Sequence, residues 1–305
     1  MGVLNKTKLI FAGILITAGS AFAQPGGQPP VGMGDPNAVS TDGYVNSSWK
    51  PSLRKDGAID RVEHNNYMTP WQPIREADVL WKKRVWMEID TRQKQNFAFR
   101  YPGDEESGGG MYIEILIDAI KNGKVTAFKD DRFTIQMDAN DVLNALSPPP
   151  DTTYRERVDG STEMIIVKKD WDPETITKYR MKEDVIFDKN IGRMVHRIIG
   201  ISPYKDIFNE DGTYRGSTPL FWLHYEDIRP INVKYEVYNP ENDVFRITWD
   251  DFFEKRHFAS YVLKSTFDNI LQTDINNNKK GIDRLYESEE IKEKIFNKEH
   301  DLWVY

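Results

Sequence analysis

Residues 233–249 read VKYEVYNPENDVFRITW, and this stretch decides the fold class. Val233, Tyr235 and Val237 alternate with polar residues, and an Asn-Pro-Glu-Asn-Asp run then leads into a second alternating run. Such alternation is typical of half-buried strands, and a short polar connection joins antiparallel neighbours. The stretch therefore predicts an antiparallel hairpin, and residues 125–137 repeat the pattern around a Lys-Asp-Asp turn.

Stretches with helical apolar spacing flank both hairpins. We expect a helix after each hairpin, at 138–146 and from 250 to about 271. Before each hairpin a helix is expected to open, at Met111 in the first case and at Leu220 in the second. The second start has Thr218 as N-cap and Pro219 at the first helical position, a strong start signal.

Further outward, two octapeptides resemble each other: EADVLWKK at 76–83 and KEDVIFDK at 182–189. Each is predicted to continue as a helix, through Val85, Trp86 and Ile89 in the first copy and through Met194, Val195, Ile198 and Ile199 in the second. The fold class predicted is α+β, with two modules of helices packed on antiparallel hairpins. Duplication and two unrelated modules of the same architecture both fit this order of elements.

The run Ser147-Pro-Pro-Pro-Asp151 predicts the boundary between the modules. Beyond it we expect a hairpin over 154–168, turning at Asp159-Gly160, and a charged amphipathic helix over 283–297. The predicted organisation is a signal peptide (1–23), a leader (24–75), a first module (76–150), a second module (151–272) and a C-terminal helix and tail (273–305).

The N-terminal residues predict export. Lys6 and Lys8 precede the apolar run 9–18, and Ala-Phe-Ala at 21–23 is a small-x-small cleavage site, which predicts cleavage between Ala23 and Gln24. Residues 24–75 follow and are rich in Pro and Gly, so they predict an extended or disordered leader.

Aromatic residues interrupt this leader at Tyr44, Trp49, Tyr67 and Trp71. They are either incidental residues of a linker or anchors for a groove on a partner. We take the four as candidate partner-binding residues.

Composition excludes several function classes. The 305 residues include no Cys, which excludes thiol nucleophiles, zinc–thiolate sites, iron–sulfur clusters and lipid attachment through cysteine. A net charge of −7 disfavours a protein whose main task is to bind nucleic acid. The one Gly run, 108–110, lacks the spacing of a phosphate-binding loop. No catalytic residue and no cofactor is predicted.

A metal site is the nearest approach to chemistry, and it is weak. His224 and Asp227 would share a helix face, and Asp250, Asp251 and His257 could complete a ligand set. The simpler interpretation is that the two aspartates stabilise a helix N-terminus and the histidines are ordinary surface residues. No metal site is predicted.

Three stretches resemble a known family: 76–96, 218–231 (TPLFWLHYEDIRPI) and 233–264, which contains WDDFFEKR at 249–256. They are similar to the gliding-motility family GldN, called PorN in non-gliding relatives, and the resemblance covers essentially the whole mature chain. It implies a periplasmic component of the type IX secretion system.

The resemblance also implies partners. These are an outer-membrane lipoprotein of the GldK/PorK type, with which the family forms a large ring, and the periplasmic part of the GldL/GldM-type motor. It implies a non-enzymatic scaffold role, and it carries no site residue over to this sequence. The alternative function is a secreted glycan-acting hydrolase or glycan-binding protein, whose site would be assembled from scattered acidic and Trp residues.

Overall fold

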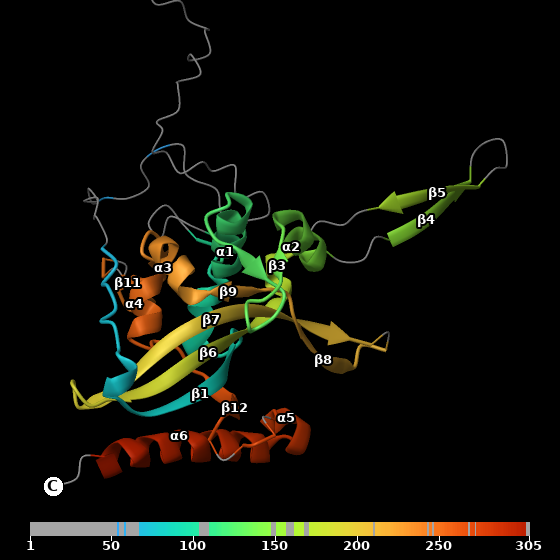
Figure 1. Ribbon diagram of the computed structural model, residues 1–305. Helices are drawn as coiled ribbons and strands as arrows, with labels where there is room; N and C mark the ends of the chain where they lie inside the picture. The colour runs from blue at the N-terminus through green and yellow to red at the C-terminus, as the bar shows by residue number, and fades with distance from the viewer. Residues whose placement is uncertain are drawn as a thin grey trace, which may run out of the picture. The chain divides into compact units, whose positions relative to one another are not determined.

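The computed structural model shows a mixed α+β chain with antiparallel sheets, as the sequence predicts (Figure 1). It describes residues 54, 58, 67–103, 110–147, 171–209, 211–242, 244–245, 247–267, 269–271 and 273–302, and the backbone of 151–156 and 162–167.

Strands β12-β1-β6-β7-β9-β2-β3 form the main sheet in this order, and β8 pairs with β7 beside this path. All the pairings between described strands are antiparallel. Their bounds are β1 Val79–Asp90, β2 Ala127–Phe128, β3 Gln136–Met137, β6 Ile176–Asp188, β7 Arg193–Phe208, β8 Tyr214–Pro219, β9 Trp222–His224 and β12 Tyr261–Ser265. Strands from residues 76–150 and from residues 151–272 thus share one sheet.

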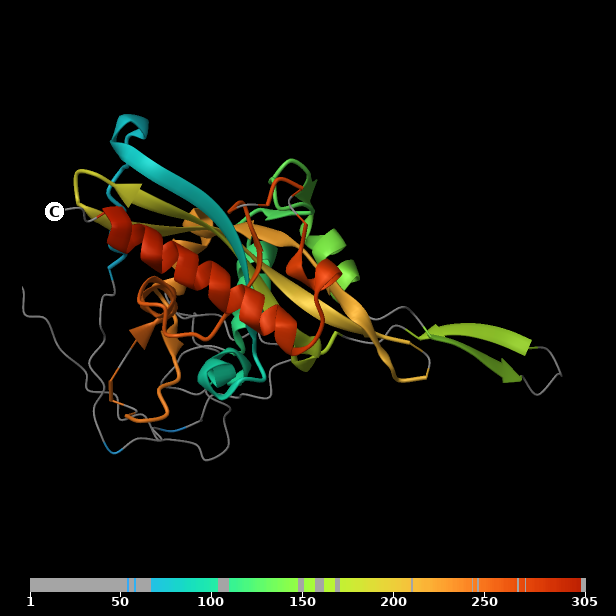
Figure 2. The ribbon, with the colours of Figure 1, turned by 90° about the horizontal axis from the view of Figure 1, so that it is seen from below.

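Helices lie on two sides of this sheet. Figure 1 shows α1, α3 and α4 above the strands and α6 below them, and Figure 2 shows α6 crossing the lower side of the sheet. The helices are α1 Tyr112–Lys121, α2 Ala139–Leu146, α3 Tyr225–Asn232, α4 Trp249–Glu254, α5 Ile275–Asn278 and α6 Ile282–Leu302, and the short 3-10 helices are Glu76–Asp78, Lys94–Arg100 and Pro173–Thr175. No helix in the described part of the chain has the length and apolarity that a membrane crossing requires.

The helical continuation predicted after the two octapeptides is wrong: residues 85–89 continue β1, and residues 194–199 lie in β7. The octapeptides themselves belong largely to strands. Residues 79–83 lie in β1 and residues 182–188 in β6, and the two strands pair directly, with Lys82 opposite Ile186. Val85 and Ile89 of β1 lie on the core face, while Trp86 between them faces the opposite side. In a strand, alternate side chains point to opposite faces, so β1 places residues on both faces of the sheet, whereas a helix would have buried only one stripe of them.

The predicted hairpins are confirmed, although their ladders are short. β2 pairs with β3, and β10 (Glu236–Val237) pairs with β11 (Ile247–Thr248). Beyond the predicted boundary, β4 (Asp151–Glu156) pairs with β5 (Thr162–Val167), as expected for a hairpin in 154–168, and its turn lies outside the described residues.

Three of the predicted helices are present, and one predicted helix start is not. The helices at 111, 138 and 283 are confirmed as α1, α2 and α6, of which α6 is longer than predicted. The start signal at Thr218-Pro219 is wrong: these residues end β8, and α3 begins at Tyr225.

The helix predicted from 250 to about 271 stops at Glu254. Arg256 adopts a left-handed φ of 56°, a conformation that ends helices, and the chain then enters β12. In this strand Val262 and Leu263 are buried. Pairing with β1 outweighs the helical spacing of the sequence.

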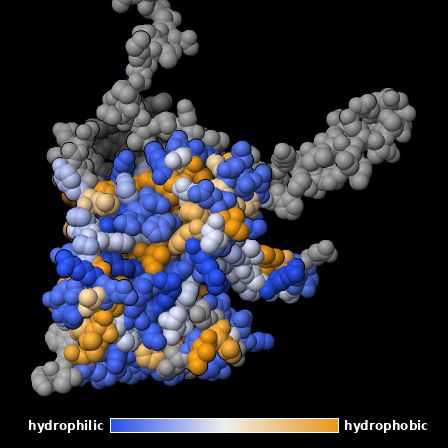
Figure 3. Space-filling view, viewed as in Figure 1, coloured by the Kyte–Doolittle hydropathy of each residue, from blue (hydrophilic) through white to orange (hydrophobic). Residues whose placement is uncertain are grey.

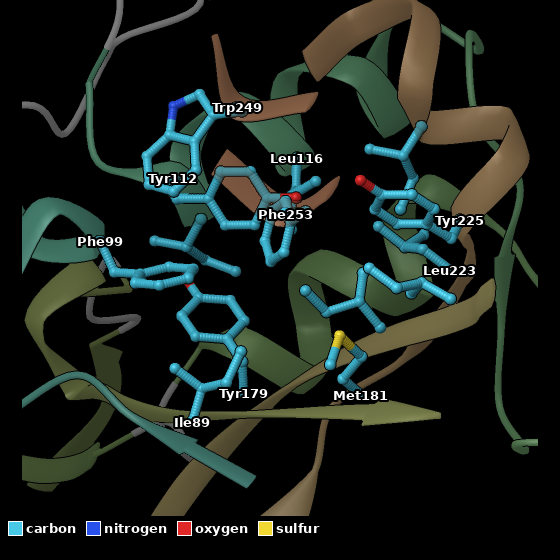
Figure 4. Packing of buried hydrophobic residues seen from close by; sticks show 14 of the residues in the cluster. Ile89, Phe99, Tyr112, Leu116, Tyr179, Met181, Leu223, Tyr225, Trp249 and Phe253 are labelled. Atoms are coloured by element: carbon cyan, nitrogen blue, oxygen red, sulfur yellow. The ribbon is translucent and has the colours of Figure 1, made fainter. Parts of the chain in front are cut away.

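The core between the sheet and the helices is largely aliphatic and contains a cluster of aromatic rings (Figure 4). Phe99, which is 2% exposed, lies at its centre. Five rings surround it at centroid distances from 5.0 to 5.9 Å: Tyr112, Tyr179, Trp249, Phe252 and Phe253. The aromatic side chains of Trp249, Phe252 and Phe253 are therefore part of the core.

Candidate functional site

Trp71, one of the four predicted partner-binding residues, packs onto its own chain. Its indole stacks on Tyr225 with centroids 6.0 Å apart and planes 20° apart. The guanidinium groups of Arg229 and Arg197 lie 4.5 and 4.9 Å from the ring centroid. The indole N–H donates to Glu254 Oε1 at 3.1 Å. Trp71 thus contacts four side chains of the folded body.

Two arginines also fix the backbone around Trp71. Arg229 Nη2 donates to the carbonyl of Thr69 at 2.8 Å, and Arg197 Nη2 donates to the carbonyl of Gln72 at 3.3 Å. Carbonyl groups that cannot pair in a strand gain charge-assisted partners here. The segment 69–72 is therefore attached to the fold at the ring and at the backbone.

Beneath Trp71 lies a buried ion pair. Arg229 and Asp250 are 2% and 6% exposed, and Arg229 Nε and Nη2 donate to the two carboxylate oxygens of Asp250 at 2.9 Å each. Burial opposes the charge on Arg229, but the hydrogen bonds and attraction of Asp250 outweigh it and raise the pKa of Arg229. The pair positions the guanidinium that supports Trp71.

Glu254 behaves differently from Asp250. Burial raises the pKa of Glu254, while the Trp71 N–H and Arg229 favour its ionised form and oppose that rise. A carboxyl group with a raised pKa can act as a proton donor in an enzyme. Here its oxygen already accepts from an indole, so the arrangement serves to hold Trp71.

Of the other three predicted partner-binding residues, the structure describes only Tyr67. Tyr67 is described and is 86% exposed, so its side chain is available for contact. Tyr44 and Trp49 lie outside the described residues, as do the predicted cleavage residues Ala23 and Gln24.

The residues weighed for a metal site are used otherwise. His224 Nδ1 lies 3.9 Å from Asp227 Oδ2 on the surface, whereas Asp250 is directed at Arg229. Asp251 lies in the first turn of α4, where its charge favours the helix dipole, and Thr248 is the N-cap. Within the described ranges, no group of three or more His, Asp or Glu side chains could hold a metal ion.

A groove of about 630 Å³ lies between α6 and the strands β1 and β12, with Met87, Phe258, Leu285 and Phe296 among its walls. Beside it Glu183, fully buried, accepts from Arg256 Nη1 at 2.7 Å and lies 3.4 Å from His196 Nδ1.

Burial opposes the charge of Glu183. His196 and Arg256 outweigh this effect and lower the pKa of Glu183. The carboxylate is therefore ionised at neutral pH, which suits an ion pair that holds the groove together and does not suit a general acid.

Helix α6 covers the sheet edge with a narrow buried stripe of Ser288, Ile291 and Ile295. Ser288 Oγ accepts from the backbone N–H of Val262 at 2.7 Å, which satisfies a donor of the edge strand β12. Leu285, on the same helix, is 46% exposed.

Large apolar side chains remain exposed on α6. Ile282, Tyr286 and Phe296 are 62–67% exposed, and Figure 3 shows apolar patches at the lower edge of that view, where α6 lies. Exposed apolar side chains gathered on one element mark a surface for association.

The sequence interpretation missed the polar face of the sheet. Lys178, Arg180, Lys182 and Asp184 alternate along β6 with core residues, a period-two signal. Arg180 Nε donates to Glu88 Oε2 at 3.2 Å and its guanidinium lies 4.2 Å from the ring centroid of Tyr204. Part of this stretch lies in the octapeptide 182–189, after which the sequence predicts a helix.

Comparison with known proteins identifies the family. The family model described as "Gliding motility associated protein GldN" matches residues 74–304, and the chain has no match among curated proteins. The match begins three residues after Trp71 and includes the whole main sheet and α6. The chain therefore belongs to the GldN family, a component of the gliding motility and type IX secretion machinery.

Proposed function

We propose that this chain is a non-enzymatic periplasmic scaffold subunit of the type IX secretion and gliding machinery. In this proposal it forms a large ring with an outer-membrane lipoprotein of the GldK/PorK type, and it contacts the periplasmic part of the GldL/GldM-type motor. The observation that carries the proposal is the family match over residues 74–304.

The surface of the fold supports a role in assembly. Exposed apolar residues lie on α6, and others lie at the free end of the β7–β8 hairpin, where Phe208 and Tyr214 are 59% and 54% exposed. Figure 1 shows this hairpin running past the rest of the sheet. A ring subunit needs at least two such surfaces, because each copy contacts a neighbour on either side.

The charged groups of the described residues support a structural role as well. Arg229–Asp250 and Arg256–Glu183 are paired ions that position other groups. The pKa of Glu183 is lowered, whereas a catalytic acid needs a raised value, and Glu254, whose pKa is raised, accepts from the Trp71 indole.

The test is affinity purification of the tagged chain from the envelope of its own cells, with partners identified by mass spectrometry. The expected partners are the GldK/PorK-type lipoprotein and the motor proteins in amounts comparable to the bait. Recovery of the chain with no envelope protein, together with activity on a glycan substrate, would favour the hydrolase alternative.

The leader has its own test. Deletion of residues 24–66 leaves the Trp71 attachment intact and removes Tyr44 and Trp49, which we propose contact a neighbouring subunit or the lipoprotein. We expect the deleted chain to fold with unchanged stability and to recover less lipoprotein. Unchanged recovery would contradict a role for these two aromatics.

A further inference from the structure

A cationic basin lies on the polar face of the sheet. It has a volume of about 470 Å³, and Trp86 lies in its lining. Six cationic side chains line it: Lys82, Lys83, Arg84, Arg132, Lys182 and Lys264. The chain as a whole carries −7, so this concentration of positive charge is local. Figure 3 shows a hydrophilic band in this part of the molecule, above α6.

Few carboxylates neutralise the basin. Asp184 accepts two hydrogen bonds from Arg84, at 2.6 and 2.9 Å, and its Oδ2 lies 2.6 Å from Lys82 Nζ. Asp131 accepts from the Trp86 indole N–H at 3.2 Å and lies 3.6 Å from Lys182 Nζ. These two carboxylates can neutralise only two of the six cationic side chains, so an excess of positive charge remains.

Trp86 lies between two of the lysines. Lys264 Nζ is 4.4 Å from its ring centroid and Lys182 Nζ is 5.9 Å from it. The side chain of Lys182 is 6% exposed. Burial lowers the pKa of Lys182, and Arg84 lowers it further, against the attraction of Asp131. An anion near Trp86 would relieve this repulsion.

The basin lies beside an open strand edge. β1 pairs with β6 along residues 79–90, whereas on its other side it pairs with β12 only from Val85 to Glu88. Residues 79–83 therefore have no strand neighbour on that side within the described part of the chain, although Thr266 and Phe267, which follow β12, contact the side chains of Lys83 and Trp81. Leu80, in this stretch, is 57% exposed. An open edge offers backbone groups to an added strand.

We propose that this basin and the adjoining edge of β1 bind an extended, carboxylate-rich polypeptide segment of a partner. The segment adds a strand beside residues 79–83, and its alternate acidic side chains reach the lysines around Trp86. Alternation places every second side chain on one face, which matches cations spread over β1, β6 and β12. The proposal goes beyond the ring assignment and does not depend on it.

A single phosphate group fits these observations less well. Arginine forks are the groups that bind phosphate in a bidentate manner, and the fork of Arg84 is occupied by Asp184. This leaves one fork, that of Arg132, among four lysines. The lysines are separate point charges, which suit several carboxylates along a chain.

The test measures binding of a fluorescein-labelled peptide of about ten residues, alternating Glu and Val, to the purified mature chain by fluorescence anisotropy. We expect saturable binding that weakens as salt is raised. The double substitution Arg132→Glu with Lys264→Glu should weaken binding by about tenfold or more, and Arg132→Gln with Lys264→Gln should weaken it less. Both side chains reach solvent, so we expect these variants to fold.

Two controls sharpen the result. Lys124→Glu with Lys234→Glu changes the net charge equally at exposed positions outside the basin, and should leave the affinity within about twofold. A peptide with the same glutamates but with Pro between them cannot pair as a strand, and should bind about tenfold more weakly.

Other outcomes overturn the proposal. Absence of peptide binding, equal binding by all the variants, or equal binding of the Pro-containing peptide would each refute it. Stronger competition by inorganic phosphate, or capture by phosphatidylglycerol vesicles in place of the peptide, would assign the basin to a different ligand.

Discussion

Trp71 connects the leader to the folded body, and its removal is the sharpest test of this attachment. We expect Trp71→Ala to lower the free energy of unfolding by about 3–4 kcal/mol. The stack on Tyr225 contributes about 1 kcal/mol, the two guanidinium contacts about 0.5–1 kcal/mol each, and the hydrogen bond to Glu254 about 1 kcal/mol. The substitution removes the stack on Tyr225 (6.0 Å between centroids), the contacts with the guanidinium groups of Arg229 and Arg197 (4.5 and 4.9 Å) and the hydrogen bond to Glu254 (3.1 Å).

The assay is urea denaturation followed by far-UV circular dichroism, with Tyr67→Ala as the matched control. Tyr67 is 86% exposed, so its substitution should change stability by less than about 0.5 kcal/mol. If Trp71→Ala also falls within about 0.5 kcal/mol of the unsubstituted chain, the intramolecular attachment is wrong. Trp71 would then be available to a partner, and the same variant should lose partner recovery without losing stability.

Trp71→Phe separates the ring from the hydrogen bond. The ring contacts remain, so we expect a loss of about 1 kcal/mol at neutral pH. Burial raises the pKa of Glu254, and loss of the indole N–H should raise it further. A raised carboxyl pKa lowers stability as pH rises through it, so the difference between the variant and the unsubstituted chain should be larger at neutral pH than below the ordinary glutamate pKa of about 4.3. An equal difference at both pH values would show that Glu254 is not coupled to Trp71.

Three further substitutions test the packing that positions the surfaces. Phe99→Ala removes the ring at the centre of the aromatic core and should cost about 3–5 kcal/mol in urea denaturation; a loss below about 1 kcal/mol would mean that the core is packed differently. Glu183→Gln leaves Arg256 without its counter-ion and should cost about 2–3 kcal/mol at neutral pH. The native pKa of Glu183 is lowered, so its contribution to stability is full above the ordinary glutamate pKa and is lost as pH falls through the native pKa. The difference in free energy of unfolding between the variant and the unsubstituted chain should therefore shrink in acid. A difference that stays constant with pH would contradict the ion pair. Ser288→Ala removes the acceptor of the Val262 N–H and should cost about 1–2 kcal/mol, with faster hydrogen exchange at that amide; unchanged exchange would show that α6 does not cap the edge.

Local signals predicted the elements that depend on neighbouring residues. The alternation around the two polar turns predicted the β2–β3 and β10–β11 pairings, and helical apolar spacing over 138–146 predicted α2. These patterns need little information from the rest of the chain. The family resemblance, carried by three stretches of sequence, was confirmed by the match over residues 74–304.

Long-range pairing explains the wrong predictions. Apolar residues at 81, 85 and 89 fit one stripe of a helix, while those at 85, 87 and 89 fit one face of a strand. The apolar pattern of β1 is therefore compatible with a helix and with a strand. Its partner β6 lies about a hundred residues further along the chain, and only that pairing decides between the two readings. Propensity is weak beside such tertiary contacts.

The same reason hid the surfaces that the proposals use. The basin joins residues of β1, β6, β12 and the β2–β3 connection, and the Trp71 attachment joins residues of the leader, α3, α4 and β7. Trp71 stood out in the sequence because an aromatic residue in a Pro/Gly-rich segment needs an explanation. Its contacts with Arg229 and Glu254 had no local signal.

The measurement that tests the scaffold role most directly is the size of the particle that carries the tagged chain after detergent extraction of the envelope. Size-exclusion chromatography with light scattering gives this mass without assumptions about shape. The proposal predicts a megadalton particle that contains many copies of the chain together with the GldK/PorK-type lipoprotein. A monodisperse species of monomer size, free of the lipoprotein, would contradict it.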